Sequence, residues 1–455
     1  MRKSLLLTVM CALVSVLAFA QTGKAWSEHF GSRSQITTYK AVARQSFPKE
    51  FKLYDLNVDP LRQQLFSIVG NAAKHSTIIS LPSAEGKIEQ FEVFEASNFE
   101  PALQAKYPEI RAFSGKGISD KYSTLKLSIS PQGVQVMIFR TEKENEFIEP
   151  YSNDRTVYAV YKSQRVKGSL PWTCTTDDKN IAASITAGLT GKVESSAGEL
   201  KTMRLAQSCN GEYANYFGAF SSADVALVLA AFNTTLTRCN GVYEKDLALH
   251  LNLIPNTADV IFYDPATDPY SNNLSAWNGQ LQATLTNIIG EDNYDIGHMF
   301  GASGGGGNAG CIGCVCNSGK GSGITSPADG IPEGDNFDID YVVHEVGHQL
   351  GGNHTFSMSL EGSGQNKEVG SGITIMGYAG ITSYDVAPHS IDIFHETSIG
   401  QIQANLATKS CPITTNITAT NATPVVAPVS NVTIPISTPF TLTGSATDAN
   451  AGDVR

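Results

Sequence analysis

The chain has 455 residues, of which 41% are hydrophobic and 16% charged, and its formal net charge is −11. This length predicts two to four domains, and the hydrophobic content is enough for packed cores, which excludes a wholly disordered chain. The acidic balance without a basic stripe argues against a nucleic-acid partner, and the single long apolar run lies at the N-terminus, which argues against an internal membrane span.

Residues 1–20 have the pattern of a secretory signal peptide. The basic pair Arg2-Lys3 precedes an apolar stretch over residues 5–19, and Ala18-Phe19-Ala20 has the small residues of a cleavage site. The apolar stretch is short for a membrane anchor. We therefore expect this segment to be removed and the mature protein to be secreted.

Residues 21–198 are predicted to form a β-rich domain. Thr124–Arg140 contains two alternating runs around Pro131-Gln132-Gly133, which predicts a hairpin, and Glu146–Tyr161 continues with strand-like runs. No cluster of catalytic residue types stands out in this region. The small and polar stretch Gly188–Leu200 predicts an exposed linker at its end.

Strand and helix patterns alternate after residue 200, which predicts an α/β domain. An apolar helix is expected to follow Ser222 as its N-cap, and residues 301–307 are expected to form a glycine-rich turn. The predicted elements are a strand over Met203–Ala206, a helix over Ala223–Phe232, a strand over Leu247–Leu253, a helix over Ser275–Ile289 and a strand over Tyr294–Phe300.

The segment Asp338–Phe356 carries the residues of a metal site. On a helix that begins near Phe337, capped by Asp335 or Asn336, His344 and His348 lie on one face. Two imidazoles at that spacing reach one Zn²⁺ ion, and Glu345 between them can take a proton from a zinc-bound water. Gly351 can end the helix with a positive φ and so bring back His354 as third ligand, which leaves a fourth position open.

A second element lies some twenty residues further on. Gly370–Gly380 reads GSGITIMGYAG, and a tight turn there can place Met376 beneath the zinc ligands as an apolar floor. Among the other histidines, His298, His389 and His395 are expected to be structural or surface groups, and His250 can face either side of its strand.

The motif H-E-x-x-H-x-x-G-x-x-H with a Met-turn resembles that of the metzincin zinc metalloendopeptidases, and within them the secreted bacterial reprolysin/adamalysin-like proteases. His344, Glu345, His348, Gly351, His354 and Met376 match without departure. The resemblance implies an α/β (α+β) catalytic domain over 199–412 with a mixed five-stranded sheet. It also implies that Asn293–Gly301 is the edge strand that binds substrate.

The same resemblance implies hydrolysis of protein or peptide substrates, with Glu345 as general base for a zinc-bound water. Astacin-like and serralysin-like metzincins carry a tyrosine two residues after the Met-turn methionine that ligates zinc and stabilises the oxyanion. Tyr378 has this spacing, whereas the adamalysin type has proline nearby, so Tyr378 is either a zinc-proximal residue or a structural one. We expect the protein to be a monomer.

Residues 21–198 resemble a propeptide in position, which predicts a zymogen. Cys174 lies just upstream of the predicted linker, and a thiolate is a good ligand for the open zinc position. The surrounding sequence PWTCTTDD does not match the familiar cysteine-switch motifs. Asp177 or Asp178 is therefore an alternative latency residue, in which case Cys174 has no role in latency or pairs with another cysteine.

Seven cysteines follow the signal peptide, and an oxidising compartment favours disulfides over a metal knuckle at Cys311, Cys314 and Cys316. The family pattern implies a Cys316–Cys411 pair. Cys209, Cys239, Cys311 and Cys314 then allow three pairings, among which sequence cannot choose. Analogy with the family makes a calcium site near Glu212 conceivable, but the expected partner after Cys411 is missing, so the site is not claimed.

Residues 413–455 are predicted to be a linker and the start of an Ig-like β-sandwich, with strands over Val432–Ile436 and Phe440–Gly444. This segment motivates an alternative function, a surface adhesion protein whose β-modules bind matrix and whose metal domain is ancillary. A zinc amidase is the third hypothesis, which the Met-turn and the substrate strand make less suitable.

Overall fold

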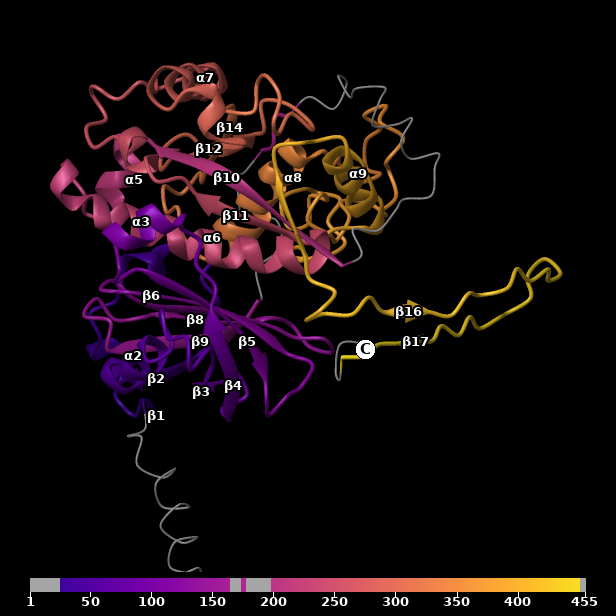
Figure 1. The fold of residues 1–455 in the computed structure, drawn as a ribbon, viewed down its shortest axis with the longest axis horizontal. Helices are drawn as coiled ribbons and strands as arrows, with labels where there is room; N and C mark the ends of the chain where they lie inside the picture. The colour runs from indigo at the N-terminus through magenta and orange to yellow at the C-terminus, as the bar shows by residue number, and fades with distance from the viewer. Residues whose placement is uncertain (1–24, 164–172, 177–197, 451–455) are drawn as a thin grey trace, which may run out of the picture.

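The computed structural model describes residues 25–163, 173–176 and 198–450. The predicted signal peptide, most of the predicted linker, Asp177 and Asp178 lie outside these ranges. No helix within them is long and apolar enough to cross a membrane. The described chain forms an N-terminal unit (residues 25–163) and a second unit (residues 198–416), with the long helix α6 (Val225–Leu247) lying between them (Figure 1).

The N-terminal unit is built on an antiparallel sheet, in keeping with its β-rich prediction. Its described strands follow the order β1-β2-β9-β8-β7-β6-β5-β4-β3. The predicted hairpin is formed by β6 and β7, with Ser130 paired to Gly133. The strands are β1 Trp26–Glu28, β2 Lys52–Leu56, β3 Thr77–Pro82, β4 Ile88–Glu95, β5 Arg111–Gly117, β6 Thr124–Ser130, β7 Gly133–Phe139, β8 Glu146–Pro150 and β9 Val157–Lys162.

The two faces of this sheet are covered by different parts of the chain. Helix α2 (Val58–Phe66) covers one face with Leu61 and Leu65, and α6 of the second unit packs on β5, β6 and β7 across the other. Strand β4 buries alternate residues, whereas β8 and most of β6 and β9 are buried on both faces. The short helix α3 (Pro101–Lys106) lies at the boundary with the second unit.

The second unit contains a mixed sheet in the order β11-β10-β12-β14-β13. The first four strands are parallel and β13 is antiparallel to β14, which gives the five strands that the resemblance implies. A sixth strand among the described residues, β15, pairs with the start of β10. The strands are β10 Glu199–Cys209, β11 Leu249–Leu253, β12 Ile296–Phe300, β13 Gly306–Asn308, β14 Gly323–Ser326 and β15 Ile413–Asn416.

Helices cover both faces of this sheet. Helix α7 (Trp277–Ile288) packs its apolar side on one face, and α6 and α8 (His344–Leu350) cover the other. Helices α5 (Gly211–Tyr216) and α9 (Glu396–Ala407) complete the unit. Two apolar clusters therefore lie on the two faces of this sheet, and the site described below lies beside its β13 edge.

The central helix is longer than its predicted extent. Helix α6 runs for 23 residues, preceded by a short turn over 222–224 in which Ser221, not Ser222, forms a capping box with Asp224. The apolar periodicity stops at Phe232 because the later turns bury polar residues against the N-terminal unit. Since α6 continues to Leu247 and ends at Ala248 with φ 50°, the next strand begins at Leu249.

The predicted substrate strand over 293–301 is wrong. Its strand, β12, lies inside the sheet between β10 and β14, and the edge is β13, within the predicted glycine-rich turn. A Cβ built on Gly307 would lie 2.2 Å from Glu345 Oε1, so this edge strand requires glycine and shows no apolar alternation.

Beyond β15 the described chain is extended and largely exposed (Figure 1). The predicted strands over 432–436 and 440–444 are not formed. The strands described beyond β15 are instead β16 (Val425–Val426) and β17 (Ala446–Thr447), which pair with each other. The prediction was based on apolar side chains alone. Such residues form stable strands only when they pack on another layer, and the described part of this segment packs on none. The Ig-like start stays a prediction.

Candidate metal centre

The histidine helix is built from two consecutive helical segments. A π-helical segment (Asn336–Val343) leads directly into α8, and Gly351, with φ 124°, ends it. The backbone N–H groups of Gly351 and Gly352 both donate to the carbonyl of Gly347, at 3.1 and 2.9 Å, so the chain reverses sharply. The predicted Asp335 cap is not made, because the helical backbone already includes that residue.

The three predicted histidines converge through their Nε2 atoms. His348 Nε2 lies 3.2 Å from His344 Nε2 and 3.0 Å from His354 Nε2, and all three residues are at most 2% exposed. Each Nδ1 faces a group that can only accept: the carbonyls of Ile375 and Gly352 at 2.7 Å, and Glu361 Oε2 at 2.8 Å. Because Nδ1 must donate, each neutral ring directs an Nε2 lone pair at the common centre.

Met376 supports this cluster from below. Its side chain is fully buried, and a Cβ built on Gly347 of α8 would lie 2.7 Å from its sulfur. Its carbonyl accepts a hydrogen bond from Thr355 N at 3.1 Å, next to the third histidine. The preceding carbonyl, that of Ile375, orients His344. The turn therefore provides both an apolar floor and a hydrogen-bond acceptor.

Cys174 of the N-terminal region completes the cluster. Its sulfur lies 3.6 Å from His348 Nε2, and the ligand atoms of Cys174 and the three histidines all lie within 4.8 Å of one another. Burial raises the pKa of the Cys174 thiol, with the neighbouring Glu345 carboxylate adding to the shift. A divalent cation at the centre would act in the opposite direction and favour the thiolate.

These donors fit a zinc ion. In a tetrahedral site with Zn–N distances of 2.0–2.1 Å and a Zn–S distance of 2.3 Å, nitrogens lie roughly 3.3 Å apart and sulfur roughly 3.6 Å from nitrogen. The separations given above are close to both values. Three buried lone pairs directed at one another repel unless a cation lies between them, so the donor set itself calls for a metal.

The comparison with known proteins agrees with this chemistry. Residues 199–407 match the family described as metallo-peptidase family M12B, reprolysin-like. This match supports a metzincin-type zinc metalloprotease domain over these residues. No curated protein matches the chain. The matched region contains the histidine cluster, Glu345 and Met376, but not Cys174, and from here on the second unit is called the metalloprotease domain.

The acidic residue of the motif lies beside the cluster and is fully buried. Glu345 Oε2 accepts a hydrogen bond from Thr176 Oγ1 at 3.1 Å, while Oε1 has no hydrogen-bond partner among the described residues. Burial is the largest cause that raises the pKa of Glu345, to about 8. A cation held by the adjacent histidines would lower it again.

The segment Thr173–Thr176 lies along the edge of the metalloprotease sheet. Gly307 N donates to Thr173 O at 3.1 Å and Thr175 N donates to Gly307 O at 2.9 Å, in a parallel pairing. Thr176 Oγ1 also accepts from Ala309 N at 2.9 Å. The segment thus occupies the edge strand, the open ligand position and one oxygen of Glu345 together.

Tyr378 lies next to the metal ligands. Its hydroxyl is 3.0 Å from His354 Nε2, and its ring packs against those of His344, His354 and Phe356. Burial raises the pKa of its phenol well above the usual value, so the hydroxyl is protonated and can donate a hydrogen bond. This position fits the zinc-proximal alternative, and its role stays a prediction.

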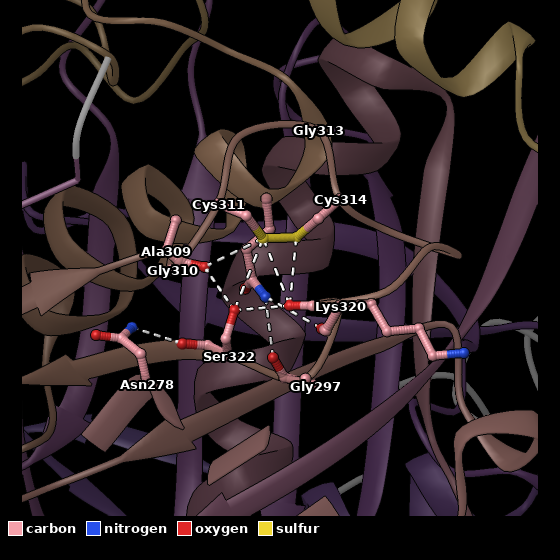
Figure 2. Close-up of a disulfide and its surroundings, with 12 residues drawn as sticks. Asn278, Gly297, Ala309, Gly310, Cys311, Gly313, Cys314, Lys320 and Ser322 are labelled. Atoms are coloured by element: carbon pink, nitrogen blue, oxygen red, sulfur yellow. Dashed lines mark hydrogen bonds between the residues drawn. A yellow bond between two sulfur atoms is a disulfide. The ribbon is translucent and has the colours of Figure 1, made fainter. Parts of the chain in front are cut away.

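The disulfides answer the question that the sequence left open. Cys316 pairs with Cys411, as the family pattern implies, and Cys311 pairs with Cys314 (Figure 2). Gly313, in the small loop of the second disulfide, donates its N–H to the carbonyl of His348 at 2.9 Å. The metal-knuckle alternative is therefore not formed. Cys209 and Cys239 are unpaired and buried in the apolar core, so the four undecided cysteines form one disulfide rather than two.

The other histidines have structural surroundings. His298 is buried between Gln349 and Thr325, with both ring nitrogens 2.8 Å from side-chain oxygens, and burial lowers its pKa to about 4. His395 caps α9 by accepting from Thr397 N. His250 contacts Glu244 and His389 contacts Ser390. None of these residues belongs to the cluster of metal-ligating groups found among the described residues.

Three residues of the site were not predicted from the sequence: Thr176, Gly307 and Glu361. Thr176 could have been found by its place two residues after the candidate Cys174. Gly307 lies in a run of glycines that gives no signal, and Glu361 follows His354 by seven residues in an irregular loop. Only the fold brings Gly307 and Glu361 to the metal centre.

Glu361 gives a first testable expectation. Because its carboxylate holds His354 Nδ1, replacing Glu361 with alanine is expected to weaken zinc affinity by about 10- to 100-fold without loss of fold. Competition with a chromophoric chelator measures this. Glu396→Ala, an exposed glutamate in the same domain, is the control and should leave the affinity unchanged. Equal zinc affinities for the two variants would show that Glu361 does not support zinc binding through His354.

Proposed function

We propose that the protein is a secreted zinc endopeptidase made as a zymogen, in which the N-terminal unit is the propeptide. This proposal rests on the convergence of the Nε2 lone pairs of His344, His348 and His354 beside Glu345. Cys174 lies at the remaining ligand position. When bound, zinc supplies a Lewis acid that polarises the scissile carbonyl and lowers the pKa of water. All other steps fall to the side chains and backbone of the chain.

Substrate is expected to bind as an extended strand on β13. The backbone N–H and carbonyl of Gly307 lie on this edge and already pair with Thr173–Thr176, which supports their ability to hold a peptide by main-chain hydrogen bonds. The missing side chain at Gly307 lets the peptide backbone and Glu345 approach closely. A substrate must therefore displace the 173–176 segment.

Glu345 is the general base. It takes a proton from the attacking water as the new C–O bond forms, and it passes that proton to the leaving amine nitrogen as the C–N bond breaks. We expect the Tyr378 hydroxyl, which lies 3.0 Å from His354 Nε2, to donate a hydrogen bond to the developing oxyanion, as its spacing from Met376 in astacin-like and serralysin-like metzincins implies.

Latency follows from three contacts of one short segment. The Cys174 sulfur takes the position that substrate and water need, the Thr176 hydroxyl engages Glu345, and the backbone covers β13. The 173–176 segment pairs with β13 in the parallel direction, with Cys174 opposite Gly307. The alternative residues Asp177 and Asp178 lie outside the described residues, so Cys174 remains the latency residue that we propose.

Metal removal tests the proposed activity. Casein hydrolysis by the proteolytically activated protein is expected to stop with a zinc chelator and to return when zinc is added back. Stoichiometric metal analysis accompanies each measurement, and an inert analogue of the chelator is the control. Activity that survives complete removal of zinc would contradict the proposal.

A further inference from the structure

We infer that the N-terminal unit stays bound to the metalloprotease domain as a second subunit after the chain between them is cut. The inference takes the zymogen processing of the proposed function as its setting, but it rests on contacts that do not involve the metal centre. Four independent features of the interface carry it: a shared apolar core, a paired sheet edge, a buried charge network and a close helix–sheet approach.

The apolar core of the N-terminal unit continues into the metalloprotease domain. One cluster of buried residues joins Phe99, Leu103, Met137, Phe139 and Phe147 to the side chains of α6, β10 and β11. Each of these five residues is at most 4% exposed. Separation of the two units would expose all of them to water, which strongly opposes dissociation. Figure 1 shows α6 between the two sheets.

The N-terminal unit also pairs with the sheet edge opposite β13. Leu253 N of β11 donates to Asn98 O at 2.7 Å, and Glu100 N donates to Leu253 O at 3.0 Å. Asn98 is buried, and its side chain bonds to Asn233, Thr237 and Asn240 of α6. Because open strand edges are free pairing sites, this contact satisfies a backbone that release would leave unpaired.

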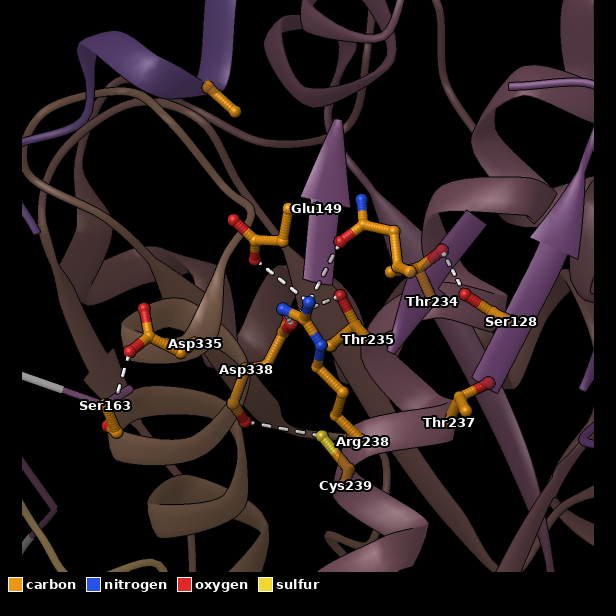
Figure 3. A network of polar contacts seen from close by, with 12 residues as sticks. Ser128, Glu149, Ser163, Thr234, Thr235, Thr237, Arg238, Cys239, Asp335 and Asp338 are labelled. Carbon is orange, nitrogen blue, oxygen red and sulfur yellow. Dashed lines mark hydrogen bonds and ion pairs between the residues drawn. The ribbon is translucent and has the colours of Figure 1, made fainter. Parts of the chain in front are cut away.

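A buried charge network crosses the interface (Figure 3). Glu149 of β8 lies between Arg44, at 2.7 Å, and Arg238 of α6, at 2.9 Å. Arg238 also pairs with Asp338, at 2.8 Å, in the π-helical segment that precedes the histidine helix. The side chains of all four residues are at most 5% exposed. Separation would break a fully desolvated ion pair, which slows dissociation in particular.

The helix and sheet approach each other closely at a glycine. A Cβ built on Gly241 of α6 would lie 2.7 Å from the ring of Phe139 and 2.9 Å from the stem of Lys126, both in the N-terminal unit. Glycine inside a long helix is unfavourable by itself, so its presence there suits the contact rather than the helix. A larger residue at this position should disturb the interface and leave the metal centre intact.

The test is association after a single cut. A recognition sequence for a specific protease is placed within residues 177–197 of the full chain, and the cut protein is passed over a size-exclusion column with mass detection. We expect both fragments to elute together at the mass of the uncut chain, including at protein concentrations on the order of 100 nM. The Cys174→Ala variant should behave in the same way, because the 173–176 segment is not the anchor.

Two glycine-to-leucine variants, one in the interface and one outside it, test whether the contact at Gly241 holds the fragments together. Gly241→Leu is expected to raise the fraction of separated fragments at least tenfold over Gly279→Leu, since Gly279 of α7 has open space around its Cβ position. Fragments of the unaltered sequence that elute separately, or equal behaviour of the two leucine variants, would overturn the inference. Should Gly241→Leu not fold, co-elution of the unaltered fragments still decides. The experiment measures association and not catalysis. Separate elution of the fragments would therefore not contradict the proposed proteolysis, and a lack of proteolytic activity would not contradict co-elution.

Discussion

Replacing Glu345 with glutamine is expected to lower kcat of the activated protein by about 10²- to 10⁴-fold, because the amide cannot take the proton of the attacking water. The side chain keeps its size in a fully buried position, so fold and histidine geometry should be retained. The three zinc ligands are untouched, and zinc content should stay the same. Hydrolysis of a fluorogenic peptide and metal analysis on the same samples measure both quantities.

The control for this variant is Glu396→Gln, which changes an exposed glutamate at the start of α9. It should leave kcat and zinc content unchanged. Full activity of the Glu345 variant would exclude it as general base. Loss of zinc together with activity would show that the carboxylate supports the metal instead of the proton transfer.

Replacing Cys174 with alanine is expected to give an uncut full-length chain that hydrolyses peptides on the order of tenfold or more faster than the uncut parent, because the fourth ligand position is no longer filled by sulfur. Activity should stay below that of the activated protein, since the segment still pairs with β13. Initial rates with a short fluorogenic peptide, in a chain whose integrity is checked by mass spectrometry, measure the effect.

Two further variants of the same segment sharpen this expectation. Thr176→Val removes the hydroxyl that engages Glu345 and should raise the activity of the uncut chain by less than the cysteine change does. Thr173→Val is the control, because Thr173 is exposed and takes part through its backbone. A silent Cys174→Ala variant in an otherwise activatable protein would refute latency by this thiol.

The convergence of the three histidines was predictable from sequence because their geometry is local. The i, i+4 spacing of His344 and His348 places both on one helix face, and Gly351 at φ 124° turns the chain so that His354 returns. The hairpin of β6 and β7 was predictable for the same reason, since a short turn fixes the pairing of adjacent strands. Local spacing and turn chemistry suffice for such features.

Features that depend on distant parts of the chain were not predictable in this way. The substrate edge was assigned to the apolar β12, but packing buries that strand and leaves the glycine strand β13 at the edge. The extent of α6 was missed because its later turns bury Asn233 and Arg238 against partners in the N-terminal unit. Burial of polar groups by a second layer cannot be read from the periodicity of one helix.

In the uncut chain, we expect three imidazoles and one thiolate to bind a single zinc ion. X-ray absorption at the zinc edge, recorded on the full-length protein and on the activated form, tests it most directly. Before activation, we expect three nitrogen neighbours at about 2.0–2.1 Å and one sulfur at about 2.3 Å, and the sulfur should be lost afterwards. A first shell with fewer than three nitrogens, or a sulfur that persists in the active enzyme, would contradict it.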